Sequence, residues 1–229
     1  MALPLVLVPG LGSDGAVWEP TIAALGDAAD CTVGDTLHDD SLAAMAARIL
    51  AAAPDRFALA GVSMGGMVAF EIMRSAPERV TRLALVDTNA RPDSAADVLR
   101  RHATNAAVAV MPDFAVAARA GLGSLVAASA STAVRDAIVA MGVRVGSTTY
   151  MRQNSAVAAR ADARPVLATI AVPTVVVIGE HDTLTPLELS REIADGIAGA
   201  QLHVIPACGH LPPIEAPAAL AAILRDWLA

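Results

Sequence analysis

One serine of this 229-residue sequence lies in a pattern that can make its hydroxyl reactive. Ser63 is the centre of Gly61-Val62-Ser63-Met64-Gly65, which follows the apolar run Phe57–Ala60 and precedes an amphipathic stretch. A sharp turn from strand to helix lifts such a hydroxyl out of a sheet, and glycines on both sides leave room for the strained backbone. The N-terminus of the next helix adds N–H groups and a positive dipole. The pattern predicts a nucleophilic serine.

A serine nucleophile needs a base, and the sequence offers five histidines. His210 follows the last apolar run in a loop rich in glycine and proline, which can carry its ring over the strand ends. His181 is the alternative base, because it stands next to an aspartate. The other histidines are interpreted as surface or strand residues: His38, His102 and His203.

The acid that orients the base is predicted to be Asp182, which comes just past the apolar run Thr174–Ile178. A carboxylate at this place can reach the far nitrogen of His210 and fix its tautomer. Asp87 is the alternative acid, because it ends the run that follows the nucleophile; its other interpretation is a loop or capping role. Glu180 is a further alternative.

Two backbone N–H groups are predicted to bind the oxyanion of the reaction intermediate. One belongs to Met64, the residue after the nucleophile. The other belongs to Leu11, in the loop Pro9-Gly10-Leu11-Gly12 after the first apolar run. The alternative interpretation of that loop is a simple flexible turn.

The elements that must position these residues alternate between short apolar runs and longer amphipathic stretches, which is typical of a parallel sheet covered on both faces. The predicted strands are Leu3–Val8, Cys31–Val33, Phe57–Ala60, Val80–Val86, Thr174–Ile178 and Leu202–Ile205. The predicted helices are Val17–Ala29, Ser41–Ala53, Met64–Ala76, Pro186–Ala198 and Ala216–Leu228, with Ser41 as an N-cap. The sequence therefore predicts an α/β fold whose mostly parallel sheet has about six strands.

Residues 89–170 interrupt this alternation with weak helical patterns and no convincing strand. We expect a helical cap or lid over a site, inserted into a core made of residues 1–88 and 171–229. The alternative is an ordinary helical layer.

The order of Ser63, Asp182 and His210, with the motifs Gly61–Gly65, Gly179–Asp182 and Gly209-His210, resembles the α/β-hydrolase fold superfamily. Within it, the chain is similar to small bacterial esterase-like serine hydrolases with a helical cap between the sixth and seventh strands. The resemblance implies an eight-stranded fold from which this chain lacks the first two strands. One departure is Pro9-Gly10, where many relatives carry His-Gly; it removes a side chain that shapes the loop.

The resemblance implies acyl transfer on a small to medium carboxylic ester, thioester or lactone, with no metal or organic cofactor. Its alternatives are a same-fold enzyme with other chemistry (C–C bond hydrolysis, cofactor-free perhydrolysis or a lyase step) and a non-catalytic ligand-binding member. Met111, Tyr150 and Leu211 are the predicted substrate pocket, and Arg152 and Gln153 are candidates for binding a polar substrate; packing and surface roles are the alternatives.

The composition excludes several other classes of protein. The chain is 55% apolar and 17% charged, which is too hydrophobic for intrinsic disorder. Its net charge of −7 argues against a nucleic-acid surface.

No stretch has the roughly 20 apolar residues of a membrane helix, and no basic segment precedes the first apolar run, so we expect no membrane contact and a cytoplasmic location. Cys31 and Cys208 indicate neither a disulfide scaffold nor a metal site, and the oligomeric state stays open.

Overall fold

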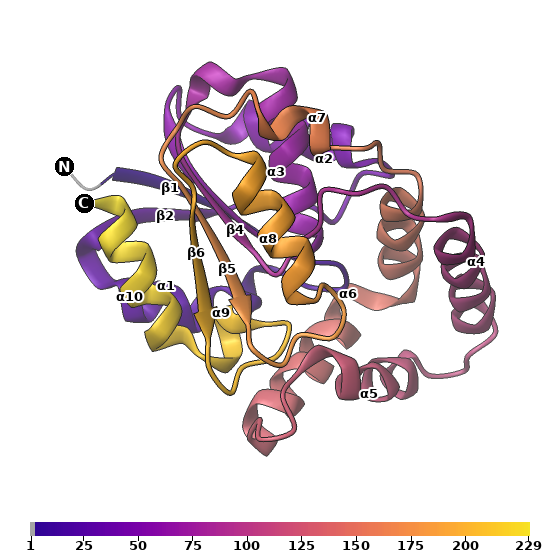
Figure 1. The fold of residues 1–229 in the computed structure, drawn as a ribbon. Helices are drawn as coiled ribbons and strands as arrows, with labels where there is room; N and C mark the ends of the chain where they lie inside the picture. The colour runs from indigo at the N-terminus through magenta and orange to yellow at the C-terminus, as the bar shows by residue number, and fades with distance from the viewer. Residues whose placement is uncertain (1–2) are drawn as a thin grey trace.

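The computed structural model describes residues 3–229, and its centre is one sheet of six strands in the order β2-β1-β3-β4-β5-β6 (Figure 1). All five neighbouring pairs are parallel. The strands are β1 (Leu3–Val8), β2 (Ala29–Val33), β3 (Phe57–Val62), β4 (Val80–Val86), β5 (Thr174–Gly179) and β6 (Gln201–Ile205). The predicted α/β fold with a six-stranded parallel sheet is confirmed.

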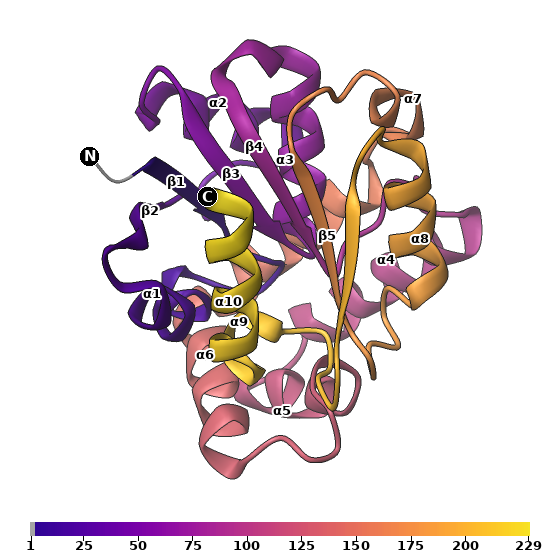
Figure 2. The same cartoon turned by 60° about the vertical axis from the view of Figure 1, so that its left-hand side comes forward.

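Helices cover both faces of the sheet, because successive strand residues point to opposite sides. In β1, Val6 and Val8 join one hydrophobic cluster, whereas Leu5 and Leu7 join the other. The first face is covered by α2 (Leu42–Ala52), α3 (Met64–Ser75) and α8 (Leu187–Gly196); the second by α1 (Glu19–Leu25) and α10 (Pro217–Leu228), as Figures 1 and 2 show. Trp18 is fully buried on the second face.

From β1 the chain continues to β2 on one side of it and then to β3 on its other side, so the order of the strands reverses between β1 and β3. This reversal determines where a crevice forms. The helix that follows β1 lies on one face and the helix that follows β3 lies on the other. In open parallel sheets, a crevice forms at the carboxyl ends of two such strands. The loop after β1 and the turn after β3 meet at this crevice.

Most predicted helices end within two residues of the observed ones, but the first is shorter than expected. A 3₁₀ turn, η1 (Gly15–Val17), precedes α1, and a second, η2 (Gly26–Ala28), follows it. Gly26 has φ +56°, which ends the helix, and β2 already begins at Ala29. The predicted N-cap is confirmed, because the Ser41 hydroxyl accepts a hydrogen bond from Ala44 N–H at 3.3 Å. The shorter elements are η3 (Pro77–Arg79) and α9 (Pro212–Glu215).

Most of the segment between β4 and β5, here called the helical insertion (residues 89–170), lies at the carboxyl ends of the strands, whereas residues 164–170 lie at the opposite end, where β5 starts (Figures 1 and 2). It contains α4 (Ala95–Ala109), α5 (Phe114–Leu125), α6 (Thr132–Ala158) and α7 (Arg164–Leu167). Gly146, with φ +77° and ψ 161°, breaks α6 into two parts. None of the helices within residues 3–229 combines the length and the apolar character that crossing a membrane requires.

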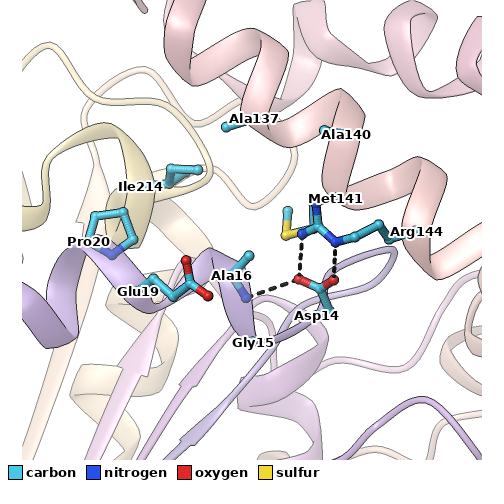
Figure 3. A pocket seen from close by; sticks show the side chains of 10 residues that line it. All are labelled: Asp14, Gly15, Ala16, Glu19, Pro20, Ala137, Ala140, Met141, Arg144 and Ile214. Carbon is cyan, nitrogen blue, oxygen red and sulfur yellow. Dashed lines mark hydrogen bonds and ion pairs between the residues drawn. The ribbon is translucent and has the colours of Figure 1, made fainter.

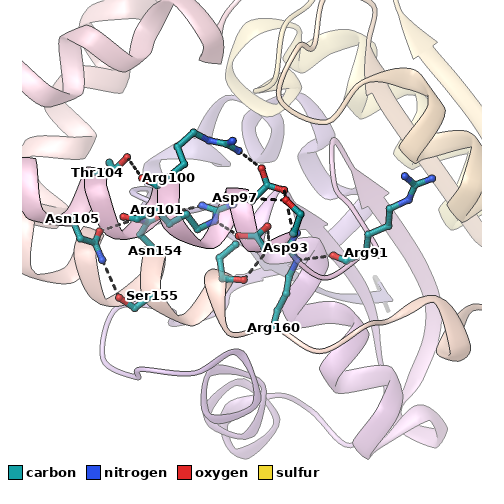
Figure 4. A network of polar contacts seen from close by, with 12 residues as sticks. Arg91, Asp93, Asp97, Arg100, Arg101, Thr104, Asn105, Asn154, Ser155 and Arg160 are labelled. Atoms are coloured by element: carbon teal, nitrogen blue, oxygen red, sulfur yellow. Dashed lines mark hydrogen bonds and ion pairs between the residues drawn. The ribbon is translucent and has the colours of Figure 1, made fainter.

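A buried polar network joins the parts of the helical insertion (Figure 4). The carboxylate of Asp93 accepts a hydrogen bond from Arg101 Nε at 2.5 Å and pairs with Arg160 Nη1 at 2.6 Å. The side chains of Asp93 and Arg160 are each only 5% exposed. Arg101 also donates to Asn154 Oδ1 at 2.8 Å, which ties α4 to the second part of α6.

Candidate active site

Ser63 occupies the one-residue turn between β3 and α3, where the backbone is strained. Its φ of +54° and ψ of −118° lie in a region that L-residues rarely adopt. Two contacts hold it there: Ser63 N–H donates to Val86 O at 2.9 Å, and Ser63 O accepts from the Thr88 hydroxyl at 2.7 Å. The neighbouring strand β4 therefore fixes the turn.

Both glycines of the predicted motif are required by close backbone approach. A Cβ added to Gly65 would lie 2.1 Å from Val8 O, because α3 starts against the end of β1. A Cβ added to Gly61 would lie 2.3 Å from Gly65 O. Their role is therefore to let three backbone segments pack around the serine.

The structure brings Ser63 and His210 into direct contact. His210 Nε2 lies 2.8 Å from Ser63 Oγ, and His210 Nδ1 lies 2.8 Å from Asp182 Oδ2. An ionised carboxylate only accepts hydrogen bonds, so Nδ1 carries the ring proton and Nε2 accepts from the serine hydroxyl. This orientation suits a base that removes the serine proton.

Asp182 is held as a carboxylate by several donors. Leu184 N–H and Thr185 N–H donate to Oδ1 at 2.8 and 3.2 Å, and the Thr185 hydroxyl donates to Oδ2 at 2.5 Å. Burial by itself would raise the pKa of Asp182, but the hydrogen bond and charge of His210 outweigh it and lower this pKa. The side chain of His181, the alternative base, is 54% exposed and lies near Glu180.

Asp87, the alternative acid, reaches the same place without replacing Asp182. It is fully buried, has φ +43°, and accepts a hydrogen bond from Gly179 N–H at 2.9 Å through Oδ1. Asp87, Asp182 and His210 each offer a ligand atom, and these atoms lie within 4.8 Å of one another. Both ring nitrogens of His210 and both oxygens of Asp182 are already engaged, so the set fits a hydrogen-bonded relay better than a cation site.

Two backbone N–H groups beside Ser63 have no acceptor. A Cβ on Gly10 would lie 3.3 Å from the Ser63 Cβ, so the loop after β1 runs alongside the nucleophile. Within residues 3–229, no hydrogen bond engages the N–H of Leu11 or of Met64. These are the two donors that the sequence indicates for an oxyanion.

The helical insertion holds the loop after β1 through Gln153, for which the sequence analysis expects a different role. Gln153, a candidate for binding a polar substrate, is fully buried and contacts backbone on both sides. Its Oε1 accepts from Gly12 N–H at 2.8 Å, and its Nε2 donates to Thr36 O at 3.0 Å. Arg152 likewise donates to Leu37 O. The expectation that these two side chains face a substrate is wrong for Gln153, because both ends of its amide are occupied by backbone groups.

Glu215 was not identified from the sequence, yet it holds the loop that carries His210. Its carboxylate accepts from the N–H groups of Gly209, Leu211 and Ala127 at 3.1, 3.0 and 2.8 Å. His210 N–H itself donates to Leu125 O at 3.0 Å. The helical insertion therefore supports the base as well as the loop after β1. The contacts with Leu125 and Ala127 come from far along the sequence, so no local pattern reveals them.

The predicted pocket residues differ in their surroundings. Tyr150 lies against the loop after β1, with its Cδ2 3.3 Å from the position of a Cβ on Gly12, and its ring is 5.3 Å from that of Phe114. Leu211 is buried in the cluster on the second face of the sheet. Met111 is half-buried in the connection between α4 and α5.

A hollow of about 640 Å³ opens between the first part of α6 and the segment from η1 to α1 (Figure 3). Ser63, Asp182 and His210 are not among the described residues that line it. At its rim, Arg144 of α6 donates two hydrogen bonds to Asp14 at 3.0 and 3.1 Å. The ion pair is a second link between the helical insertion and the loop after β1.

Comparison with known proteins places this geometry in a family. The sequence model of the alpha/beta hydrolase family matches residues 5–223. A pimeloyl-[acyl-carrier protein] methyl ester esterase of Vibrio parahaemolyticus is 26% identical over 242 residues, covering 97% of this chain and 93% of that protein.

Solved structures agree with the sequence comparison. A thermophilic esterase from Thermogutta terrifontis superposes with a TM-score of 0.89 at 28% identity, covering 100% of this chain and 90% of the other. The enol-lactonase of Burkholderia xenovorans gives a TM-score of 0.87 at 25% identity, covering 100% and 92%. With its six-stranded parallel sheet and its family match over nearly the whole length, this chain belongs to the alpha/beta hydrolase family.

Proposed function

We propose that this protein is a serine hydrolase that cleaves small to medium carboxylic esters or lactones through Ser63, His210 and Asp182. The observation that carries the proposal is the unbroken line of hydrogen bonds from Ser63 Oγ through His210 to Asp182, each 2.8 Å long. The N–H groups of Leu11 and Met64, which no hydrogen bond engages within residues 3–229, are the proposed donors to the oxyanion. Relatives named as a methyl ester esterase and an enol-lactonase support acyl–oxygen cleavage as the reaction.

In this mechanism His210 takes the proton of Ser63 while Oγ attacks the substrate carbonyl carbon. The carbonyl oxygen gains the electron pair, and the N–H groups of Leu11 and Met64 stabilise it. The intermediate collapses by breaking the acyl C–O bond, and His210 gives its proton to the leaving alkoxide. Water, activated by the same base, then attacks the acyl-enzyme; the acid leaves and Ser63 regains its proton.

The helical insertion is proposed to act as the cap that selects the acyl group. It contacts the loop that carries Leu11 through Gln153 and the loop that carries His210 through Leu125. Tyr150 and Leu211 flank these two loops, and with Met111 they form the proposed apolar pocket. Such a lining suits a short acyl or alkyl group better than a charged one.

The test is hydrolysis of p-nitrophenyl acetate and butyrate by the wild-type protein and by Ser63→Ala. We expect Ser63→Ala to fold and to lose about 10⁶-fold in kcat, because only the nucleophilic hydroxyl is removed. Ser75→Ala, an exposed position at the end of α3, is the matched control and keeps its activity. Ester turnover that survives in Ser63→Ala would contradict the mechanism, and wild-type cleavage of a vinylogous diketone but not of esters would indicate C–C bond hydrolysis instead.

A further inference from the structure

Two buried carboxyl groups share the end of the sheet, but their surroundings differ. Asp182 Oδ1 and Oδ2 together accept four hydrogen bonds, from Leu184 N–H, from the N–H and hydroxyl of Thr185, and from His210. Asp87 accepts one, from Gly179 N–H. The second oxygen of Asp87, Oδ2, is buried and meets no donor in the described part of the chain.

This difference decides which of the two groups is ionised. Two carboxylates this close and this buried repel each other, so one of them keeps a proton. The negative charge is most stable where donors are most numerous, which is on Asp182. A proton on Asp87 Oδ2 also turns an oxygen that has no hydrogen bond into a donor, which removes the cost of burying it unpaired.

We propose that Asp87 is a positioning residue that stays protonated at neutral pH and donates a hydrogen bond to the carboxylate of Asp182. It then supports the carboxylate of Asp182 without adding a second negative charge next to His210. The role in catalysis rests on the proposed function of Ser63, but the protonation of Asp87 does not.

The other ionisable groups near Asp87 favour the same state. Burial and the charge of Asp182 raise the pKa of Asp87 well above its ordinary value, and the charge of Glu215 raises it further. The buried thiol of Cys208 also has a raised pKa and brings no positive charge. His210, whose ring directs its proton to Asp182, is the remaining titratable neighbour.

The proposal predicts how stability changes with pH. Between the pKa of an unfolded aspartate and the higher pKa of Asp87 in the fold, the native protein holds a proton that the unfolded chain has released. The wild-type free energy of unfolding therefore falls as pH rises through this window. Asp87→Asn removes the effect: asparagine tolerates φ above zero, accepts from Gly179 N–H and donates to Asp182 without titrating.

The experiment is urea unfolding of the wild type, Asp87→Asn and the control Asp226→Asn, an exposed carboxylate on α10, from pH 5 to pH 8. The ratio of the wild-type to the Asp87→Asn unfolding constant is expected to grow by about tenfold per pH unit within the window, whereas the ratio to Asp226→Asn stays flat. A flat ratio for Asp87→Asn would overturn the proposal. If Asp87→Asn does not fold, the infrared spectrum of the wild type at pH 7 still decides, because the proposal requires the band of a protonated carboxyl group at that pH and its absence overturns the proposal.

The kcat of variants at the two positions distinguishes a positioning role of Asp87 from the role of the acid that orients His210. We expect Asp87→Asn to lose less than about tenfold in kcat and Asp182→Asn to lose about 10⁴-fold, because only the latter sets the tautomer of His210. Asp87→Gly, which adopts the positive φ freely but cannot donate, should lose more than Asp87→Asn. The reverse ranking of the two asparagine variants would assign the acid to Asp87. A protein that turns over no ester would refute the proposed function and leave the pH dependence of unfolding as an independent test.

Discussion

At the scale of single residues, the site depends on backbone segments that touch one another. Val8 O, Gly61 and Gly65 pack so closely that a methyl group fits at neither glycine. Ser63 adopts its strained conformation between these close contacts and directly precedes the first residue of α3. The strain is therefore maintained by packing of the strands and the helix, not by the serine itself.

We predict that Gly65→Ala lowers the free energy of unfolding by about 3 kcal/mol or more, because its Cβ would lie 2.1 Å from Val8 O. Gly123→Ala is the matched control in α5, where an added Cβ has nothing within 4 Å. It should instead stabilise by up to about 1 kcal/mol, since alanine is the better helix residue. Urea midpoints of the two variants measure both effects. A similar, small change in both would show that the backbone can shift to fit a methyl group at Gly65 with little loss in the free energy of unfolding.

The sequence predicts which residues approach Ser63 only where a local pattern marks them. Ser63 and His210 stand in glycine-containing turns after apolar runs, so both were identifiable. Gln153 and Glu215 carry no such mark: their partners are backbone groups up to 141 residues away. Their roles follow from the way the insertion packs on the core, which no local spacing contains.

At the scale of elements, the central strands were predictable because they are buried on both faces and read as continuous apolar runs, whereas the edge strands β2 and β6 are partly exposed. β3 and β5 are buried at every position, and both were identified, although each extends one or two residues farther than expected. Helix ends were less predictable, as at Gly26, where a positive φ ends α1 four residues early. Two helices of the insertion had weak patterns because they bury few side chains: α4 buries only Val108, and α5 buries none.

The second part of α6 is expected to position the loop after β1 through Gln153. Gln153→Leu removes the acceptor of Gly12 N–H and the donor to Thr36 O, so the loop can shift Leu11 N–H away from the oxyanion. We expect kcat for p-nitrophenyl esters to fall by about 10- to 100-fold with a small change in KM, since misplaced catalytic groups cost rate rather than binding.

Gln153→Glu is the conservative comparison, because it still accepts from Gly12 N–H but no longer donates to Thr36 O. It should lie between the wild type and Gln153→Leu in kcat. Gln153→Leu is expected to lose kcat even at urea concentrations well below its unfolding midpoint. If it unfolds at lower urea but has the wild-type kcat under those conditions, Gln153 serves stability alone.

At the scale of the whole molecule, the helical insertion and the core form one connected structure. Gln153 and Arg144 join α6 to the loop after β1, and Glu215 joins the loop of His210 to residue 127. Within the insertion, the buried pair of Asp93 and Arg160 fixes the chain that leaves β4. We therefore expect the two parts to unfold together.

Asp93→Asn tests this connection. It leaves the buried guanidinium of Arg160 without its charge partner, which costs about 3–5 kcal/mol. Both tryptophans, Trp18 and Trp227, lie in the core and none lies in the insertion. Tryptophan fluorescence and far-ultraviolet circular dichroism should therefore shift to lower urea together. A shift of the dichroism with an unmoved fluorescence midpoint would show that the insertion unfolds on its own.

We expect His210 to activate Ser63 as the nucleophile, and labelling with a serine-directed fluorophosphonate measures this activation. Peptide mass mapping should find one adduct per chain, on Ser63, formed by the wild type and much more slowly by His210→Ala. The absence of an adduct on Ser63, or labelling at the same rate without His210, would contradict the account.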